Sequence, residues 1–87
     1  MNTVSAPVMP VQAFYIDMET PAVNATMRRL GRLKDTIRLE SDGMYREDNH
    51  YTRLYIETFW SEDKLEAWLD KTSVVEYSGI IETELRG

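Results

Sequence analysis

Two similar segments, forty residues apart, each predict a strand that leads into a helix. Phe-Tyr-Ile-Asp at residues 14–17 precedes Thr20 and Pro21, and Leu-Tyr-Ile-Glu at residues 54–57 precedes Ser61. Thr and Ser side chains accept hydrogen bonds from the first amides of a helix, and Pro fits the first helical turn because its missing N–H would have no partner there. Two strand-to-helix units in 87 residues predict a duplicated β-α arrangement.

The size of the chain leaves room for one domain with a small core. A core built from 87 residues rarely stabilises by more than about 3–5 kcal/mol on its own, so we expect self-association, with a homodimer as its simplest form. Residues 1–10 are small, polar or proline and show no period. They predict a flexible leader ahead of a single domain over residues 11–87.

Charge and composition exclude several kinds of site. The net charge of −5 disfavours a general affinity for nucleic acid, which needs a basic surface. The sequence has no cysteine and one histidine, so it lacks a disulfide framework, a thiol nucleophile and the ligands of a zinc cluster. No run approaches the ~20 apolar residues of a membrane span, and no secretory signal is recognisable. We therefore expect a soluble cytoplasmic protein without a catalytic motif, a metal or a cofactor.

The order of apolar and polar residues predicts four strands and two helices. Strands are expected at residues 11–18, 36–46 and 51–60, with a turn at residues 47–50 and a bulge at Gly43. The last strand is expected within residues 74–85, where Gly79 separates a short turn from the strand proper at residues 80–85. The helices should present apolar stripes to the core: Val23, Met27, Leu30, Leu33 and Lys34 in the first, and Leu65, Trp68 and Leu69 in the second, which begins at Ser61 and ends at residues 72–73.

This β-α-β-β-α-β order predicts an α+β fold of the ferredoxin-like sandwich type. The four strands would form an antiparallel sheet with both helices on one face, and the strands at residues 11–18 and 51–60 would lie parallel at its centre. If Phe14 and Ile16 face the helices, alternation places their neighbours on the other face, which no helix covers. We predict that this open sheet face is a docking surface, formed by Tyr15, Asp17, Arg53, Tyr55, Glu57 and Phe59.

Aromatic residues on two adjacent central strands are also the means by which RNA-recognition motifs stack bases. The third strand of that family carries a basic, glycine-containing consensus, which residues 51–59 lack. Asp17 and Glu57 on the same face would repel phosphates. The sequence therefore favours a protein partner over RNA.

Residues 57–69 (Glu-Thr-Phe-Trp-Ser-Glu-Asp-Lys-Leu-Glu-Ala-Trp-Leu) resemble the strand-to-helix segment of small dimeric α+β barrel proteins, the family that includes antibiotic-biosynthesis monooxygenases. The resemblance covers about a quarter of the chain. It implies a homodimer in which two open sheets face each other and enclose a small-molecule pocket. Many members carry a histidine-containing loop after the second helix, whereas residues 72–77 of this chain read Thr-Ser-Val-Val-Glu-Tyr. A haem or substrate ligand of that family is therefore absent from this segment.

Charge is distributed unevenly along the chain. Five of the ten basic residues lie between residues 28 and 38, and eight acids lie between residues 57 and 84. Because both helices should cover one face of the sheet, we expect cations of the first helix to pair with acids of the second. The alternative is that the first helix binds an anion or a partner. The basic residues concerned are Arg28, Arg29, Arg32, Lys34 and Arg38.

The second helix should carry an acidic stripe, because Glu62, Glu66 and Asp70 recur every four residues. Such a stripe is either a solvated surface or a contact for a basic partner. His50, in the predicted turn, is expected to be an exposed residue rather than a general base.

These features favour a small acidic, non-enzymatic protein-interaction module of the regulator or inhibitor type, including the kind that phages and mobile elements encode. It would bind a protein partner or a second copy of itself through the open sheet face and the acidic stripe. The alternative is a cofactor-free dimeric α+β barrel enzyme, monooxygenase- or isomerase-like, that acts on an apolar small molecule. Tyr15, Arg53 and Tyr55 would line its pocket.

Overall fold

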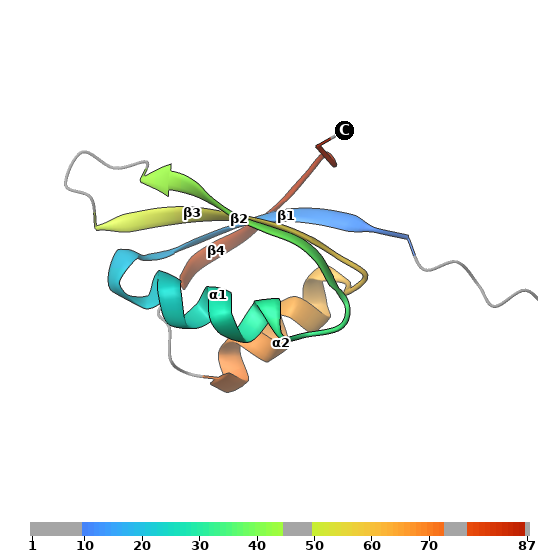
Figure 1. Ribbon diagram of the computed structural model, residues 1–87, viewed down its shortest axis with the longest axis horizontal. Coiled ribbons are helices and arrows are strands. Elements are labelled where there is room, and N and C mark those ends of the chain that lie inside the picture. The colour runs from blue at the N-terminus through green and yellow to red at the C-terminus, as the bar shows by residue number, and fades with distance from the viewer. Residues whose placement is uncertain (1–9, 45–49, 73–76, 87) are drawn as a thin grey trace, which may run out of the picture.

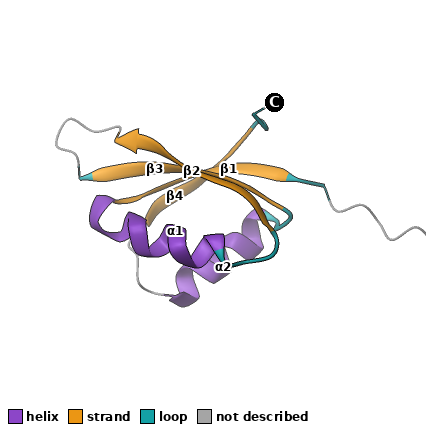
Figure 2. Cartoon of the chain, in the orientation of Figure 1, coloured by secondary structure: helices purple, strands orange, loops and turns teal. Residues whose placement is uncertain are grey.

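The computed structural model describes residues 10–44, 50–72 and 77–86, which form one sheet and one layer of helices. Figure 1 shows both helices on the same side of the four-stranded sheet, and Figure 2 distinguishes helices from strands in the same view. The predicted α+β class is confirmed, whereas residues 1–9 of the expected leader lie outside the described residues. In chain order the elements are β1 (Gln12–Glu19), the 3₁₀ turn η1 (Thr20–Ala22), α1 (Val23–Gly31), β2 (Thr36–Met44), β3 (Tyr51–Thr58), α2 (Glu62–Thr72) and β4 (Tyr77–Thr83).

The strands lie in the order β2-β3-β1-β4, and every pair of neighbours is antiparallel. The prediction that the two central strands are parallel is wrong, because β1 and β3 pair antiparallel with Tyr15 opposite Tyr55. The chain returns along α1, so β2 runs in the direction of β1, and the reversal between β2 and β3 then sends β3 the opposite way. The antiparallel register places Asp17 opposite Arg53, so an acid and a base of the open sheet face come together.

The hydrophobic core lies between the sheet and the helices. Phe14 and Ile16 belong to it, as the alternation of β1 predicted. Burying an apolar side chain of this size contributes about 1.5–3 kcal/mol, so the core fixes the strands whose opposite face carries the candidate site. The buried members of the core are Phe14, Ile16, Met18, Val23, Leu30, Leu54, Ile56, Trp60, Leu65 and Leu69.

The two helices begin differently. α2 starts as predicted, because the backbone amide of Lys64 donates to Oγ of Ser61 at 3.2 Å. The prediction that Thr20 caps the first helix is wrong: its Oγ1 lies 2.9 Å from Oγ1 of Thr52 on β3. Pro21 occupies the first turn of η1, and α1 follows at Val23 without a side-chain cap.

The first helix is also shorter than its apolar stripe predicted. α1 ends at Gly31, so Lys34 lies beyond the helix and is exposed. Glycine has a low helix propensity, which explains the early end. Leu33, which follows the helix, still packs against the core. No helix among the described residues has the length and apolar character needed to cross a bilayer.

Strand β2 pairs irregularly with β3 at two places. The predicted bulge at Gly43 is confirmed, since the register shifts between Ser41 and Met44 and Gly43 has a φ of +88°. Glycine adopts this backbone conformation without the steric cost that other residues incur. A second shift, between Thr36 and Arg38, was not predicted. Most of the turn expected at residues 47–50 lies outside the described residues.

The last strand lies within residues 74–85, as predicted, but it begins and ends earlier than the strand proper expected at residues 80–85. β4 covers Tyr77–Thr83, so Gly79 lies inside the strand and pairs with Asp17 instead of dividing a turn from the strand. The register shifts next to this pair, between Asp17 and Met18, which places a bulge there. After Thr83 the chain leaves the sheet on the side away from the helices (Figure 1). Residues 84–86, called the covering segment below, carry the arginine that reaches the open sheet face.

Candidate functional site

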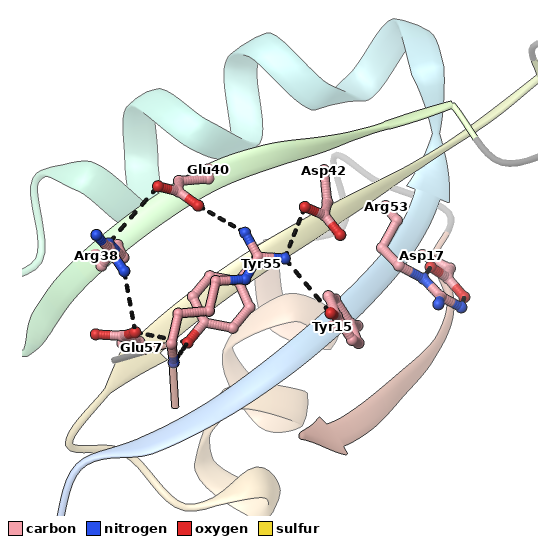
Figure 3. Close-up of polar contacts among 9 residues, drawn as sticks. Tyr15, Asp17, Arg38, Glu40, Asp42, Arg53, Tyr55 and Glu57 are labelled. Atoms are coloured by element: carbon pink, nitrogen blue, oxygen red, sulfur yellow. Dashed lines mark hydrogen bonds and ion pairs between the residues drawn. The ribbon is translucent and has the colours of Figure 1, made fainter. Parts of the chain in front are cut away.

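The open sheet face has two tyrosines at its centre. Tyr15 of β1 and Tyr55 of β3 lie opposite each other, and their rings meet edge to face with centroids 5.9 Å apart. Beside them, Nε and Nη2 of Arg53 donate to the two carboxylate oxygens of Asp17 at 2.8 and 3.0 Å. Asp17 is only 6% exposed, so this two-pronged ion pair fixes both side chains. The strands thus bring together four of the residues that the sequence placed on this face (Figure 3).

Strand β2 adds three charged residues that the sequence analysis did not assign to the site. Glu40 lies opposite Tyr55, and Arg38 lies opposite Glu57, so their side chains join the open sheet face. Arg38 makes ion pairs of 3.6 Å with Glu40 and 3.7 Å with Glu57. Asp42 follows two residues later. Arg38, Glu40 and Asp42 alternate with Leu39, which is partly buried and packs against the core, and this alternation indicates that the three charged residues lie on the open sheet face.

Arg86 of the covering segment lies over this face. Its Nη1 donates to Glu40 at 2.7 Å, and its Nη2 donates to Asp42 at 2.6 Å and to the Tyr15 hydroxyl at 3.4 Å. Its guanidinium carbon stands 3.9 Å from the centre of the Tyr55 ring. The seat defined by Tyr15, Glu40, Asp42 and Tyr55 therefore holds the guanidinium by two carboxylates and an aromatic face at once.

Tyr55 is completely buried by this arrangement. Its hydroxyl donates to Oε2 of Glu57 at 2.5 Å and accepts from the backbone amide of Arg86 at 2.9 Å. Burial, together with the hydrogen bond to Glu57, raises the pKa of Tyr55 above 10.0. Hydrogen bonds to Tyr15 and Asp42 raise the pKa of Arg86 above its usual value. Both groups keep their protons at neutral pH, which suits recognition rather than proton transfer.

Phe59 lies outside this network of polar contacts. It follows the last residue of β3, is half-buried, and its amide donates to the carbonyl oxygen of Asp35 at 3.1 Å. Glu57, the other predicted residue near this end, does belong to the network through Tyr55 and Arg38. The structure therefore joins five of the six predicted residues of the open sheet face and sets Phe59 apart.

His50 is exposed, as predicted, and lies at the opposite end of β1 and β3 from Glu57. Its carbonyl oxygen accepts a hydrogen bond of 2.8 Å from the amide of Thr20. With Glu19, Thr20 and Pro21 it lines an open hollow of about 430 Å³. Neither Tyr15 nor Tyr55 borders that hollow. Within the described residues, no group of three histidine or acidic side chains is placed to hold a metal ion.

The acidic stripe of α2 is exposed at Glu62, Glu66 and Asp70. It faces the β4 side of the molecule, because Asp70 accepts a hydrogen bond of 2.6 Å from the Tyr77 hydroxyl. Burial and Asp70 raise the pKa of Tyr77 to about 12. The stripe keeps its remaining carboxylates in solvent, where a basic partner can reach them.

The prediction that cations of α1 pair with acids of α2 is wrong. In the first turn of α2, Nζ of Lys64 stands 4.9 Å from the centre of the Trp60 ring. Nε1 of Trp60 donates to Asp35, just after α1, at 3.0 Å. No ion pair among the described residues joins a cation of α1 to an acid of α2. Across the part of the chain that the structure describes, the exposed cations in α1 and in the segment just after it make no ion pair: Arg28, Arg29, Arg32 and Lys34.

Comparisons with models of protein families, with curated proteins and with solved structures find no match to this chain.

Proposed function

We propose that this chain is a small, non-enzymatic protein-interaction module of the regulator or inhibitor type. It binds its partner on the open sheet face, with the acidic stripe of α2 as a second contact. The observation that carries the proposal is the composition of that face: aromatic and arginine side chains gather on strands β1 and β3, and neither α1 nor α2 lies over them (Figures 1 and 3). Aromatic residues and arginine are the types most enriched at the energetic centres of protein interfaces.

The fold gives this proposal a rigid platform. We propose that the β-α-β-β-α-β order and the strand order β2-β3-β1-β4 form a ferredoxin-like sandwich. In such a sandwich one sheet face is used for the core and the other is available for binding. Sites built on strands keep their geometry better than sites on loops, and the central residues Tyr15 and Tyr55 both lie in mid-strand.

Partner capture with matched surface variants tests the proposal. The open-face variant is Tyr15→Ala with Ile81→Ser, since Ile81 is paired with Tyr15 and is 46% exposed. The stripe variant is Glu62→Gln with Glu66→Gln, and Asn24→Ala on the exposed side of α1 is the control. Proteins retained by the wild type from cells that encode the chain are identified, purified and titrated against each variant.

We expect the open-face variant to bind the purified partner at least about tenfold more weakly, which corresponds to roughly 1.4 kcal/mol. The stripe variant should show a smaller loss that shrinks further at high salt, and the control should match the wild type. Equal affinity of the open-face variant and the wild type would contradict the proposal.

A second copy of the chain is a candidate partner on the same face. Light scattering over a hundredfold range of concentration, roughly that which spans a micromolar dissociation constant, tests this homodimer. We expect a mass that rises from 10.2 kDa toward twice that value. A mass of 10.2 kDa at every concentration would exclude the homodimer, and with it the dimeric barrel enzyme, because one sheet cannot close such a barrel.

A further inference from the structure

The seat formed by Tyr15, Glu40, Asp42 and Tyr55 already holds a guanidinium group, that of Arg86. The two terminal nitrogens of this guanidinium bind separate carboxylates. Nη1 lies 2.7 Å from Glu40, and Nη2 lies 2.6 Å from Asp42. The central carbon of the guanidinium lies over the Tyr55 ring, 3.9 Å from its centre. This geometry matches the fixed donors and the stacking surface of arginine, whereas the ammonium of lysine is a compact point charge that cannot satisfy all three contacts in the same way.

Arg86 belongs to the covering segment, which hydrogen bonds of this residue hold to the open sheet face. Within the described residues, the contacts of the covering segment to the open sheet face come from Arg86 itself, through its side chain and its amide. Leu85 is 49% exposed, so it is not part of a buried core. Glu40, Asp42 and Arg86 are each about a third exposed or more. Exposed ion pairs of this kind are weak because water and salt compete for both charges.

We infer that the open sheet face recognises an arginine side chain presented by an extended segment of the partner protein, and that Arg86 is the resident occupant which this arginine displaces. The inference rests on the proposed function and names the chemistry of its partner. When Arg86 leaves, the Tyr55 ring and the carboxylates of Glu40 and Asp42 become available together. The partner's guanidinium then binds the same two carboxylates and lies over the same face of the Tyr55 ring.

The covering segment would also tune the affinity of the site. A tethered ligand competes at an effective concentration in roughly the millimolar range, so a partner must bind the vacant seat well enough to overcome Arg86. Vacating the seat should therefore strengthen binding of an external arginine.

The test uses the full chain with Arg86→Gln, which keeps the backbone amide that donates to Tyr55. The probe is the peptide Thr-Glu-Leu-Arg-Gly, which repeats residues 83–87. Matched peptides carry citrulline, a neutral group of similar shape, or lysine in place of arginine. Binding is followed by NMR titration. We expect the arginine peptide to bind Arg86→Gln at least about tenfold more tightly than either matched peptide and at least about tenfold more tightly than it binds the wild type.

Adding Glu40→Gln and Asp42→Asn to Arg86→Gln should abolish the preference for arginine over citrulline. Adding Glu62→Gln and Glu66→Gln on α2 should preserve it, because those acids lie on the helix side of the sheet (Figure 1). Equal binding of the arginine and citrulline peptides, or no binding of either by a folded Arg86→Gln chain, would overturn the inference. If that variant does not fold, the wild type is titrated instead. Shifts of the Tyr55 ring signals caused by the arginine peptide alone support the inference, and the absence of such a difference overturns it.

The two proposals can fail separately. If the arginine peptide binds selectively but the open-face variant keeps its purified partner, the seat is real and the proposed function is wrong. If the open-face variant loses its partner and no peptide shows a preference for arginine, the proposed function stands and the arginine inference fails.

Discussion

Tyr15 and Tyr55 lie opposite each other in the sheet, yet their hydroxyl groups have different partners. The Tyr55 hydroxyl joins Glu57 and the Arg86 amide by bonds of 2.5 and 2.9 Å, whereas the Tyr15 hydroxyl has a contact of 3.4 Å to Arg86. We therefore expect the hydroxyl of Tyr55 to contribute more to the stability of the fold than the hydroxyl of Tyr15 does. The difference follows from burial, since Tyr55 is completely covered and Tyr15 is half-buried.

Tyr55→Phe should lower the free energy of unfolding by about 1–3 kcal/mol, because it leaves Glu57 without its buried hydrogen-bond donor. Tyr15→Phe, the matched control, should cost less than about 1 kcal/mol, since it removes one long contact. Urea unfolding of both variants, followed by circular dichroism, measures the two values. Equal losses would show that the hydroxyl of Tyr55 has no special role.

At the scale of elements, the sequence predicted local signals well and distant partners poorly. Ser61 could be recognised as a helix cap because its partner, the Lys64 amide, is three residues away. Thr20 could not be excluded as a cap, because the group that takes its hydroxyl, Thr52, lies 32 residues further along the chain. Strand alternation placed Tyr15 and Tyr55 on one face, but nothing local indicates that Arg86 lies over them, since its contact to Tyr15 spans 71 residues.

Ser61→Ala should destabilise the protein by about 1 kcal/mol, because the first amides of α2 lose a side-chain acceptor. Ser61→Asp should restore most of the stability, since a carboxylate both accepts the hydrogen bond and interacts favourably with the positive end of the helix. Chemical denaturation of the three proteins gives the comparison. An alanine variant as stable as the wild type would mean that the 3.2 Å contact contributes nothing.

The exposed cations in α1 and just after it should have little effect on stability. Arg28→Gln and Arg32→Gln should each change the free energy of unfolding by less than about 0.5 kcal/mol, because neither arginine has an ion-pair partner among the described residues. Arg53→Gln, which breaks the two-pronged pair with the buried Asp17, should cost about 1.5–3 kcal/mol. Thermal unfolding ranks the stability of the variants. A large loss of stability in Arg28→Gln would support the prediction that cations of α1 form ion pairs with acids of α2.

At the scale of the whole molecule, the phenol groups of Tyr55 and Tyr77 link stability to alkaline pH. The folded pKa of Tyr77 is about 12 against 10.0 for an unperturbed tyrosine, and the pKa of Tyr55 is also raised. Below pH 10.0 both the folded and the unfolded states hold these protons, so the stabilisation is fully present. As the pH rises from 10.0 toward 12, the unfolded state releases its protons first, and the free energy of unfolding falls.

Tyr77→Phe should therefore weaken the decline of stability between pH 10.0 and about 12, because one of the two phenols no longer titrates. Asp70→Asn should bring the pKa of Tyr77 closer to 10.0, since the carboxylate is a cause of the raised value. Tyrosinate absorbance reports the pKa, and urea midpoints across the same pH range report stability. A slope unchanged in Tyr77→Phe would contradict the link.

The irregular pairing of β2 has a consequence for how sheets of this protein can meet in solution. β2 is an outer strand, and its ladder to β3 is broken at Gly43 and again between Thr36 and Arg38. A strand with such kinks is a poor template for lateral addition of another chain. The other outer strand, β4, has one shift in its ladder, between the partners of Asp17 and Met18, and pairs regularly from Gly79 to Thr83. Addition of a strand from another molecule would therefore be favoured at β4 and disfavoured at β2. Two molecules that pair through their β4 strands leave only β2 strands at the outer edges, so the association stops short of an amyloid-like fibril.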